Sequence, residues 1–154
     1  MSQKSVLFVC LGNICRSPMA EAALRAEAVA QGIAVSIDSA GTGAMHVGDA
    51  PDPRAQAETL RHGIDISSYR ARQLTEADFR KFGHIYVMDQ NNLRDLHAVA
   101  PWRPLAKIGL LMDVVPGRHG TAVLDPYYGG EDDFAEVWED VTVAAKHIVA
   151  RLAK

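Results

Sequence analysis

The chain has 154 residues, a length that suits one domain with a single buried core. Apolar residues make up 48% and charged residues 23%, so the composition excludes a disordered or fibrous protein. A formal net charge of -3 at pH 7 provides no basic field for a polyanion, and we expect no nucleic-acid partner. We therefore expect a single domain over residues 1–154.

The cysteine content and the N-terminus indicate where the protein works. Cys10 and Cys15 are the only cysteines, too few for a disulfide framework or a Cys-rich zinc site. The first four residues, Met-Ser-Gln-Lys, show no signal-peptide pattern, and the apolar run Val6–Leu11 is far shorter than the ~20 residues of a membrane-spanning helix. We expect a cytoplasmic protein without membrane insertion.

The chain begins with a strand, a loop and a helix. Residues 5–9 form a continuous apolar run rich in β-branched side chains, which is typical of a buried parallel strand. After a short loop, Ser17 and Pro18 suit the N-cap and the first position of a helix. Alanines and Met19 recur on one face of that helix, and we expect it to end at Gly32.

Strands and helices continue to alternate along the chain. The patterns predict, in order, a strand at 33–37, a helix from Asp52-Pro53 to His62-Gly63, a short amphipathic segment from Thr75, a strand at 84–88, a helix at 91–97 and a strand at 105–108. Strands that alternate with helices indicate an α/β fold, a doubly wound open sheet of about four parallel strands with helices on both faces. In such folds the site lies outside the carboxyl ends of the strands.

The C-terminal part combines a long loop with the clearest helix. Residues 114–130 contain two prolines and four glycines, which predicts a long surface loop, and such loops are often functional. From Phe134 to Leu152 apolar residues recur at helical spacing. Three acidic residues, 131–133, fit the first turn of this helix, where they complement its dipole.

The loop after the first strand has the parts needed to bind and attack a phosphate. Its successive backbone N–H groups can converge on an anion at the start of the helix, and Gly12 and Asn13 both tolerate the positive φ that such a curl needs. Arg16 offers a planar fork to two phosphate oxygens. We therefore expect phosphate binding by Leu11, Gly12, Asn13, Ile14, Cys15, Arg16 and Ser17.

Cys10 lies at the base of this loop, where the same N–H groups favour the thiolate that acts as a nucleophile. Ser17 is within reach of its sulfur. A lone cysteine after a strand is usually a small core residue, and a lone arginine at a helix start is usually a surface charge. The combination of Cys10 and Arg16 at this spacing is much more specific for a phosphate site.

The loop lacks the Gly-Lys-Ser/Thr ending of nucleotide P-loops and the three-glycine dinucleotide pattern, so we expect no nucleotide cofactor.

Asp125 in the long loop is the candidate general acid. It would protonate the departing oxygen and then activate the water that attacks the phosphoenzyme. An Asp-Pro pair more often only begins a turn, so Asp125-Pro126 alone is weak evidence. Tyr127 and Tyr128 follow it and are candidates for an aromatic wall.

The six histidines show no metal-ligand spacing, so we expect each to be solvated or to have its hydrogen bonds made within the protein, and we expect no metal.

These motifs together resemble the low-molecular-weight protein tyrosine phosphatase family over essentially the whole chain. The segments that carry the resemblance are Val9–Pro18, Asp38–Ala40, Asp52–Arg54, Ala71–Gln73, Met88–Asp89, Asn92–Leu96 and Asp125–Tyr128. The resemblance implies hydrolysis of phosphotyrosine in proteins through a phosphocysteine intermediate, with inorganic phosphate as product and no cofactor. It also implies a set of roles: nucleophile Cys10, phosphate-binding Arg16, general acid Asp125, supporting Asn13, Ser17, Ser39 and Asp89, and a substrate wall of Tyr127 and Tyr128.

Two positions depart from the family pattern. Met45 stands where the family usually has an aromatic residue as the other side of the substrate slot, which implies a softer wall. Tyr69 stands where the family often has a histidine that supports the loop, and a phenol titrates differently. The two loop cysteines also suggest a reversible disulfide under peroxide.

Three other functions fit parts of the sequence. An arsenate reductase of this fold needs further cysteines, and none follows Cys15. A protein-arginine phosphatase of the same family typically has Thr where this chain has Ile14, so Ile14 favours phosphotyrosine. A module that only binds phosphate needs neither the nucleophile Cys10 nor the acid Asp125.

Overall fold

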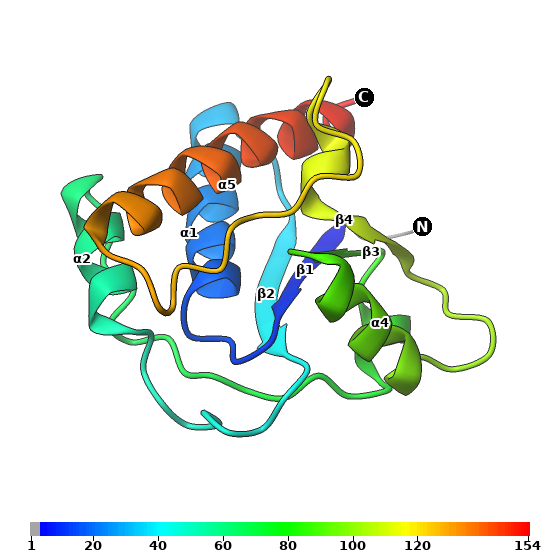
Figure 1. Cartoon of the computed structure of the whole chain (residues 1–154). Helices are drawn as coiled ribbons and strands as arrows, with labels where there is room; N and C mark the ends of the chain where they lie inside the picture. The colour runs from blue at the N-terminus through cyan, green and yellow to red at the C-terminus, as the bar shows by residue number, and fades with distance from the viewer. Residues whose placement is uncertain (1–3) are drawn as a thin grey trace.

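The computed structural model describes residues 4–154. Residues 1–3, which form most of the N-terminal stretch without a signal-peptide pattern, lie outside the described part. The described chain contains one sheet of four parallel strands in the order β2-β1-β3-β4 (Figure 1). The strands are β1 (Ser5–Cys10), β2 (Ser36–Gly41), β3 (His84–Val87) and β4 (Lys107–Leu110).

Helices cover both faces of this sheet. On one face lie α1 (Arg16–Gln31), α2 (Pro53–Arg61) and α5 (Glu131–Leu152). The other face is covered by α3 (Asp78–Lys81) and α4 (Gln90–Val99), and a 3₁₀ turn, η1 (Leu111–Val114), follows β4. The α/β, doubly wound parallel fold expected from the sequence is thereby confirmed.

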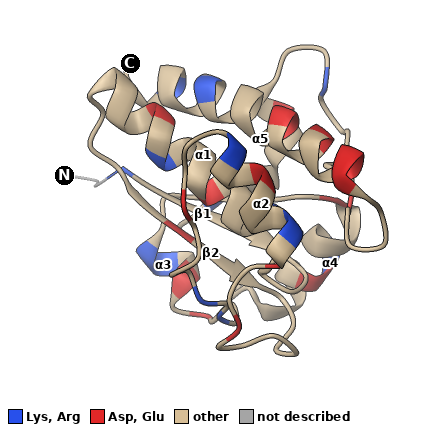
Figure 2. Cartoon of the chain, turned by 90° about the vertical axis from the view of Figure 1, so that its left-hand side faces the viewer, with Lys and Arg blue, Asp and Glu red and all other residues tan. Residues whose placement is uncertain are grey.

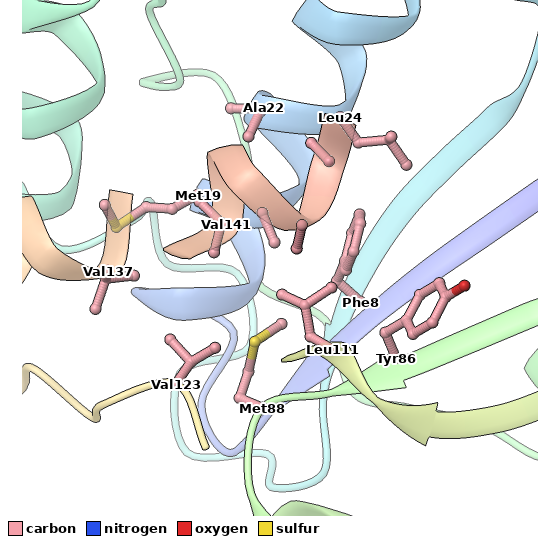
Figure 3. Packing of buried hydrophobic residues seen from close by; sticks show 14 of the residues in the cluster. Phe8, Met19, Ala22, Leu24, Tyr86, Met88, Leu111, Val123, Val137 and Val141 are labelled. Carbon is pink, nitrogen blue, oxygen red and sulfur yellow. The ribbon is translucent and has the colours of Figure 1, made fainter. Parts of the chain in front are cut away.

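The central strand β1 is buried along its whole length because both of its faces are covered. Val6, Phe8 and Cys10 belong to the core beneath α1 and α5, whereas Leu7 and Val9 belong to the core beneath α3 and α4. Figure 3 shows Phe8 packed among residues of the first core, including Met19 and Val141. A strand buried on both faces explains why its sequence is apolar without alternation.

Three predicted boundaries are wrong. The strand predicted at 105–108 lies two residues later, at Lys107–Leu110, and hydrogen bonds explain the other two. The predicted strand at 33–37 begins only at Ser36, because the Ile33 N–H donates to the Ala28 carbonyl and closes the end of α1 around Gly32, whose φ is 69°. Helix α1 begins at Arg16 with Cys15 at the N-cap, and Ser17 makes no cap because its hydroxyl bonds Cys10 and Asn13 instead.

Residues 115–130 join η1 to α5 as one long irregular segment, as predicted, but not all of it lies at the surface. Val123 is buried, and its N–H donates to the Met88 carbonyl at the end of β3 over 2.8 Å. This hydrogen bond holds the middle of the segment against the sheet, and the segment continues from there towards α2 (Figure 1).

The C-terminal helix α5 begins at Glu131, and its first turn carries the three predicted acidic residues, red at the end of α5 in Figure 2. Within residues 4–154, none of the helices has the length and apolar character that a membrane span requires.

The close approach of β2 to the loop after β1 gives a test of the packing. A Cβ added at Gly41 would lie 2.7 Å from the Leu11 carbonyl oxygen and 3.2 Å from the Asn13 nitrogen, which are backbone atoms. We expect Gly41→Ala to lower the free energy of unfolding, measured in urea, by ~1–3 kcal/mol, the usual range for overpacking. Gly109→Ala in β4 is the matched control, because its Cβ would meet nothing closer than 3.9 Å. Equal stability of the two variants would contradict this packing.

Candidate functional site

The carboxyl end of β1 opens into a pocket of about 240 Å³. The pocket brings together segments that are more than 100 residues apart in the sequence. Its lining residues are Cys10, Leu11, Gly12, Ile14, Cys15, Arg16, Met45, His46, Asp125, Tyr127 and Tyr128. One pocket is therefore lined by all three proposed catalytic residues, by the three wall residues and by most of the predicted phosphate-binding residues. The four supporting residues do not line it: Asn13, Ser17, Ser39 and Asp89.

The sulfur of Cys10 lies at the base of the pocket and is bonded by its own loop. The Asn13 N–H donates to Cys10 Sγ over 3.3 Å, and Ser17 Oγ lies 3.0 Å from the same sulfur. Cys10 is only 3% exposed. Because the loop leads directly into the N-terminus of α1, the positive end of that helix dipole also points towards the loop.

Asn13 holds the curl of the loop. Its φ is 58°, a left-handed value, and it is the one described residue other than glycine with positive φ. Asn13 Nδ2 donates to Ser17 Oγ over 2.7 Å and to Ser39 Oγ over 3.0 Å, and Asn13 Oδ1 accepts from the Arg72 N–H over 3.0 Å. The side chain is thus bonded on three sides, which offsets the cost of its unfavourable backbone conformation.

Gly12 does not have the positive φ that was expected of it, and its nearest constraint is a side chain. A Cβ on Gly12 would lie 3.0 Å from the His46 ring. His46 itself lines the pocket and contacts Asp49 through Nδ1 at 3.2 Å. A pocket-lining role was not expected for any histidine, although His46 directly follows Met45, a predicted wall residue.

A buried carboxyl group that no sequence pattern indicated extends the Asn13 network. Ser39 Oγ donates to Glu21 Oε1 over 2.7 Å, and Arg25 Nε donates to Glu21 Oε2 over 2.9 Å. Burial raises the pKa of Glu21, while the hydrogen bond from Ser39 and the charge of Arg25 oppose that rise. Tyr69 lies at the outer end of the network, and burial together with the charge of Glu21 raises the pKa of its phenol.

Arg16 projects from the first position of α1 into the site with almost no exposure. Its Nη1 donates to Asp89 Oδ2 over 2.8 Å and to the Val123 carbonyl over 3.0 Å. Asp89 Oδ1 in turn accepts from the Asn92 N–H over 2.8 Å and caps α4. The guanidinium plane is therefore fixed by the N-cap residue of α4 and by the long segment, and Nη2 faces Asp125.

Asp125 lies at the mouth of the pocket. Its carboxylate is 51% exposed, and Oδ2 lies 3.6 Å from Arg16 Nη2. Oδ1 accepts from the Tyr127 N–H over 3.2 Å, as expected at the start of a turn. Tyr127 and Tyr128 meet edge to face with ring centroids 4.9 Å apart, and Tyr128 is 95% exposed. Met45 lines the same pocket and is largely exposed.

The environment of Cys15 argues against one premise of a peroxide-sensitive disulfide. Burial, reinforced by the negative charge of Asp52, raises the pKa of the Cys15 thiol far above its usual range. The raised pKa disfavours the thiolate form of Cys15 that would attack an oxidised Cys10. Both cysteines are free and buried.

Across residues 4–154 no three His, Cys, Asp or Glu side chains are grouped so that they could hold a metal ion. The polar groups at the pocket are donors for an anion, chiefly Arg16 and backbone N–H groups, so their chemistry suits a phosphate.

Comparisons with known proteins relate this site to a family. The family model described as "Low molecular weight phosphotyrosine protein phosphatase" matches residues 5–154. A relative with that name from Schizosaccharomyces pombe is 42% identical over 151 residues, which cover 96% of each chain.

Solved structures are similar over the same length. The crystal structure of a protein tyrosine phosphatase from Entamoeba histolytica matches with a TM-score of 0.91 at 34% identity, covering 98% of this chain and 97% of that chain. The structure of a Drosophila arginine phosphatase matches with a TM-score of 0.90 at 31% identity, covering 97% of this chain and 98% of that chain.

The buried position of Glu21 predicts a pH dependence of stability. A carboxyl group whose pKa is raised on folding stabilises the folded state fully below its unfolded pKa, and that contribution is lost as pH rises through the folded pKa. Glu21→Gln removes this titration while keeping the size of the side chain. In urea unfolding, the stability of the wild type relative to Glu21→Gln should therefore fall as the pH rises above 4.5, the ordinary pKa of this carboxyl group. A difference that stays constant, or that grows with pH, would contradict the burial of this carboxyl group.

Proposed function

Because this chain belongs to the low-molecular-weight protein tyrosine phosphatase family, we propose that it hydrolyses phosphotyrosine in proteins and releases inorganic phosphate. The family is metal-independent and uses a phosphocysteine intermediate. One observation supports the proposal most strongly: Cys10 Sγ lies at the base of a pocket that is also lined by Arg16 and Asp125. Binding of a phosphate alone would need Arg16 but neither a nucleophile nor an acid.

In the first step the Cys10 thiolate attacks phosphorus, an S–P bond forms and the bond to the tyrosine oxygen breaks. Asp125 gives its proton to the departing phenolate oxygen. Arg16 and the N–H groups of the loop hold the three remaining phosphate oxygens, where charge is present throughout the transfer. The Ser17 hydroxyl and the Asn13 N–H, at 3.0 and 3.3 Å from Cys10 Sγ, stabilise the sulfur as a thiolate.

In the second step the Asp125 carboxylate removes a proton from a water molecule that attacks phosphorus. The S–P bond breaks, the thiolate of Cys10 is restored and phosphate leaves. The same bonds from Ser17 and Asn13 that stabilise the attacking thiolate stabilise it again as a leaving group. One carboxyl group thus serves both steps, since it ends the first step as the base that the second step needs.

The walls of the pocket favour an aromatic ester. Tyr127 and Tyr128 border one side, and Met45 and Ile14 supply further apolar surface. Ile14 in place of the Thr that is typical of protein-arginine phosphatases favours phosphotyrosine over phosphoarginine. The similarity to a Drosophila arginine phosphatase makes phosphoarginine the second candidate.

We assign the protein to the cytoplasm, because Cys10 must stay reduced to act.

The nucleophile assignment predicts that Cys10→Ser abolishes hydrolysis of phosphotyrosine peptides. A serine hydroxyl is a much weaker nucleophile in a site that has no adjacent base to activate it. Initial rates of phosphate release measure the effect, and circular dichroism checks that the variant is folded. A folded Cys10→Ser protein that retains wild-type turnover would refute the assignment.

The acid assignment predicts that the effect of Asp125→Ala depends on the leaving group. For phosphotyrosine peptides, kcat/KM should fall by ~10²–10⁴-fold, the usual contribution of general acid catalysis. For aryl phosphates whose phenols are strongly acidic the loss should be much smaller, because those oxygens leave without a proton. An equal loss for all leaving groups would show that Asp125 is not the acid.

The choice between substrates can be tested with matched peptides that carry phosphotyrosine, phosphoarginine or phosphoserine. We expect the highest kcat/KM for phosphotyrosine and little activity on phosphoserine. Ile14→Thr should raise the ratio of phosphoarginine to phosphotyrosine activity. A wild-type preference for phosphoarginine would overturn the proposed substrate while leaving the role of Cys10 intact.

A further inference from the structure

Arg54 makes a set of bonds that none of the roles above uses. It lies in the first turn of α2, directly after the N-cap Asp52 and Pro53. Asp52 fixes the base of the side chain, because Asp52 Oδ1 accepts from the Arg54 N–H over 2.8 Å and from Nε over 3.0 Å. Asp52 Oδ2 accepts from Arg54 Nη2 over 2.9 Å. The guanidinium group is therefore held in one plane by its neighbour.

The outer face of this guanidinium group binds the segment that carries Asp125. Arg54 Nη1 donates to the Gly129 carbonyl over 3.0 Å, and Nη2 donates to the Tyr127 carbonyl over 2.8 Å. The Phe134 ring at the start of α5 lies 4.7 Å from the centre of the guanidinium group. In Figure 1 the segment that precedes α5 accordingly approaches the beginning of α2.

Tyr127 links Arg54 to Asp125. Its carbonyl accepts from Arg54, while its N–H donates to Asp125 Oδ1. The Gly129 N–H closes the turn on the Pro126 carbonyl over 2.9 Å. Arg54 thus bonds two carbonyls of the same tight turn that orients the carboxyl group of Asp125.

The same first turn of α2 is also bonded to the loop around Cys10. The Asp52 N–H donates to the Ile14 carbonyl over 2.8 Å. The pair Asp52 and Arg54 therefore connects the loop of the nucleophile to the turn of the acid, although about 110 residues separate Cys10 from Asp125 in the sequence. This connection matters because Asp125 is half exposed and its 3.6 Å approach to Arg16 is too long for a strong hydrogen bond.

We propose that Arg54 is a positioning residue that, by holding the Tyr127 and Gly129 carbonyls, directs the Asp125 carboxyl group towards the leaving oxygen. Arg54 itself touches no reacting atom. The inference rests on the proposed function, since it concerns the step in which Asp125 protonates the phenolate. It predicts that loss of Arg54 impairs protonation selectively and leaves the attack by Cys10 largely intact.

The experiment compares kcat/KM across a series of aryl phosphates with phenols of increasing pKa. Arg54→Met keeps the approximate length of the side chain but removes all of its side-chain donors. We expect a loss of at least ~10-fold for the least acidic phenols, a part of the ~10²–10⁴-fold of general acid catalysis. For the most acidic phenols we expect little change. The slope of log kcat/KM against leaving-group pKa should therefore become steeper.

Two further variants separate geometry from charge and from general loosening. Arg54→Lys keeps the charge but cannot bond two carbonyls and a carboxylate in one plane, so it should also steepen the slope. It serves as the test protein if Arg54→Met does not fold. Arg118→Met is the matched control, because Arg118 ties the same long segment to Asp140 of α5 through two 3.3 Å contacts far from the turn. Its slope should equal that of the wild type.

The double variant completes the test. In an Asp125→Ala background, Arg54→Met should not steepen the slope further, because the group that it positions is gone. The inference is overturned if Arg54→Met lowers kcat/KM equally for all leaving groups, if it changes nothing, or if Arg118→Met has the same effect. In each of these cases an inactive Cys10→Ser and a leaving-group-sensitive Asp125→Ala would still uphold the proposed function.

Discussion

The left-handed conformation of Asn13 is the constraint on which the site depends. A residue with φ of 58° turns the loop sharply enough for the Asn13 N–H to reach Cys10 Sγ at the base of the pocket. Such a conformation is unfavourable for most side chains, and here three hydrogen bonds to the Asn13 amide hold it. These bonds come from α1, β2 and the segment before α3, so the loop has its shape only when the sheet and helices are assembled.

The rest of the fold brings a half-exposed acid to this buried loop. Parallel strands end at one edge, which places the Cys10 loop next to β2 and β3, and Asp89 after β3 fixes Arg16. Asp125 comes from the far end of the chain on an irregular segment. It is held by Val123 on one side and by Arg54 on the other. The nucleophile is thus buried and tightly bonded, whereas the acid is half exposed and depends on bonds to backbone carbonyls.

The sequence predicted those parts of the fold and site whose signals are local. The apolar run of β1, the capping Asp52 and the stripe of α5 each depend on neighbouring residues, and the structure has all three elements. The strand at 33–37 was misplaced because Ile33 completes the cap of α1. The contacts of Glu21, His46 and Arg54 were missed for a different reason, although Arg54 lies in a segment that carries the resemblance. Their partners are a buried hydroxyl, a glycine and two carbonyls that only tertiary structure brings near, and these leave no pattern in the sequence.

The central claim is that phosphate is transferred to Cys10, and the most direct measurement is to capture that intermediate. The Asp125→Ala protein should be mixed with an aryl phosphate whose phenol is strongly acidic, quenched rapidly in acid, digested and analysed by mass spectrometry. Because the phenol leaves without help while the second step lacks its base, the intermediate should accumulate. The account predicts one phosphate on the sulfur of Cys10. Phosphate on another residue, or turnover with no covalent phosphate at any time, would contradict it.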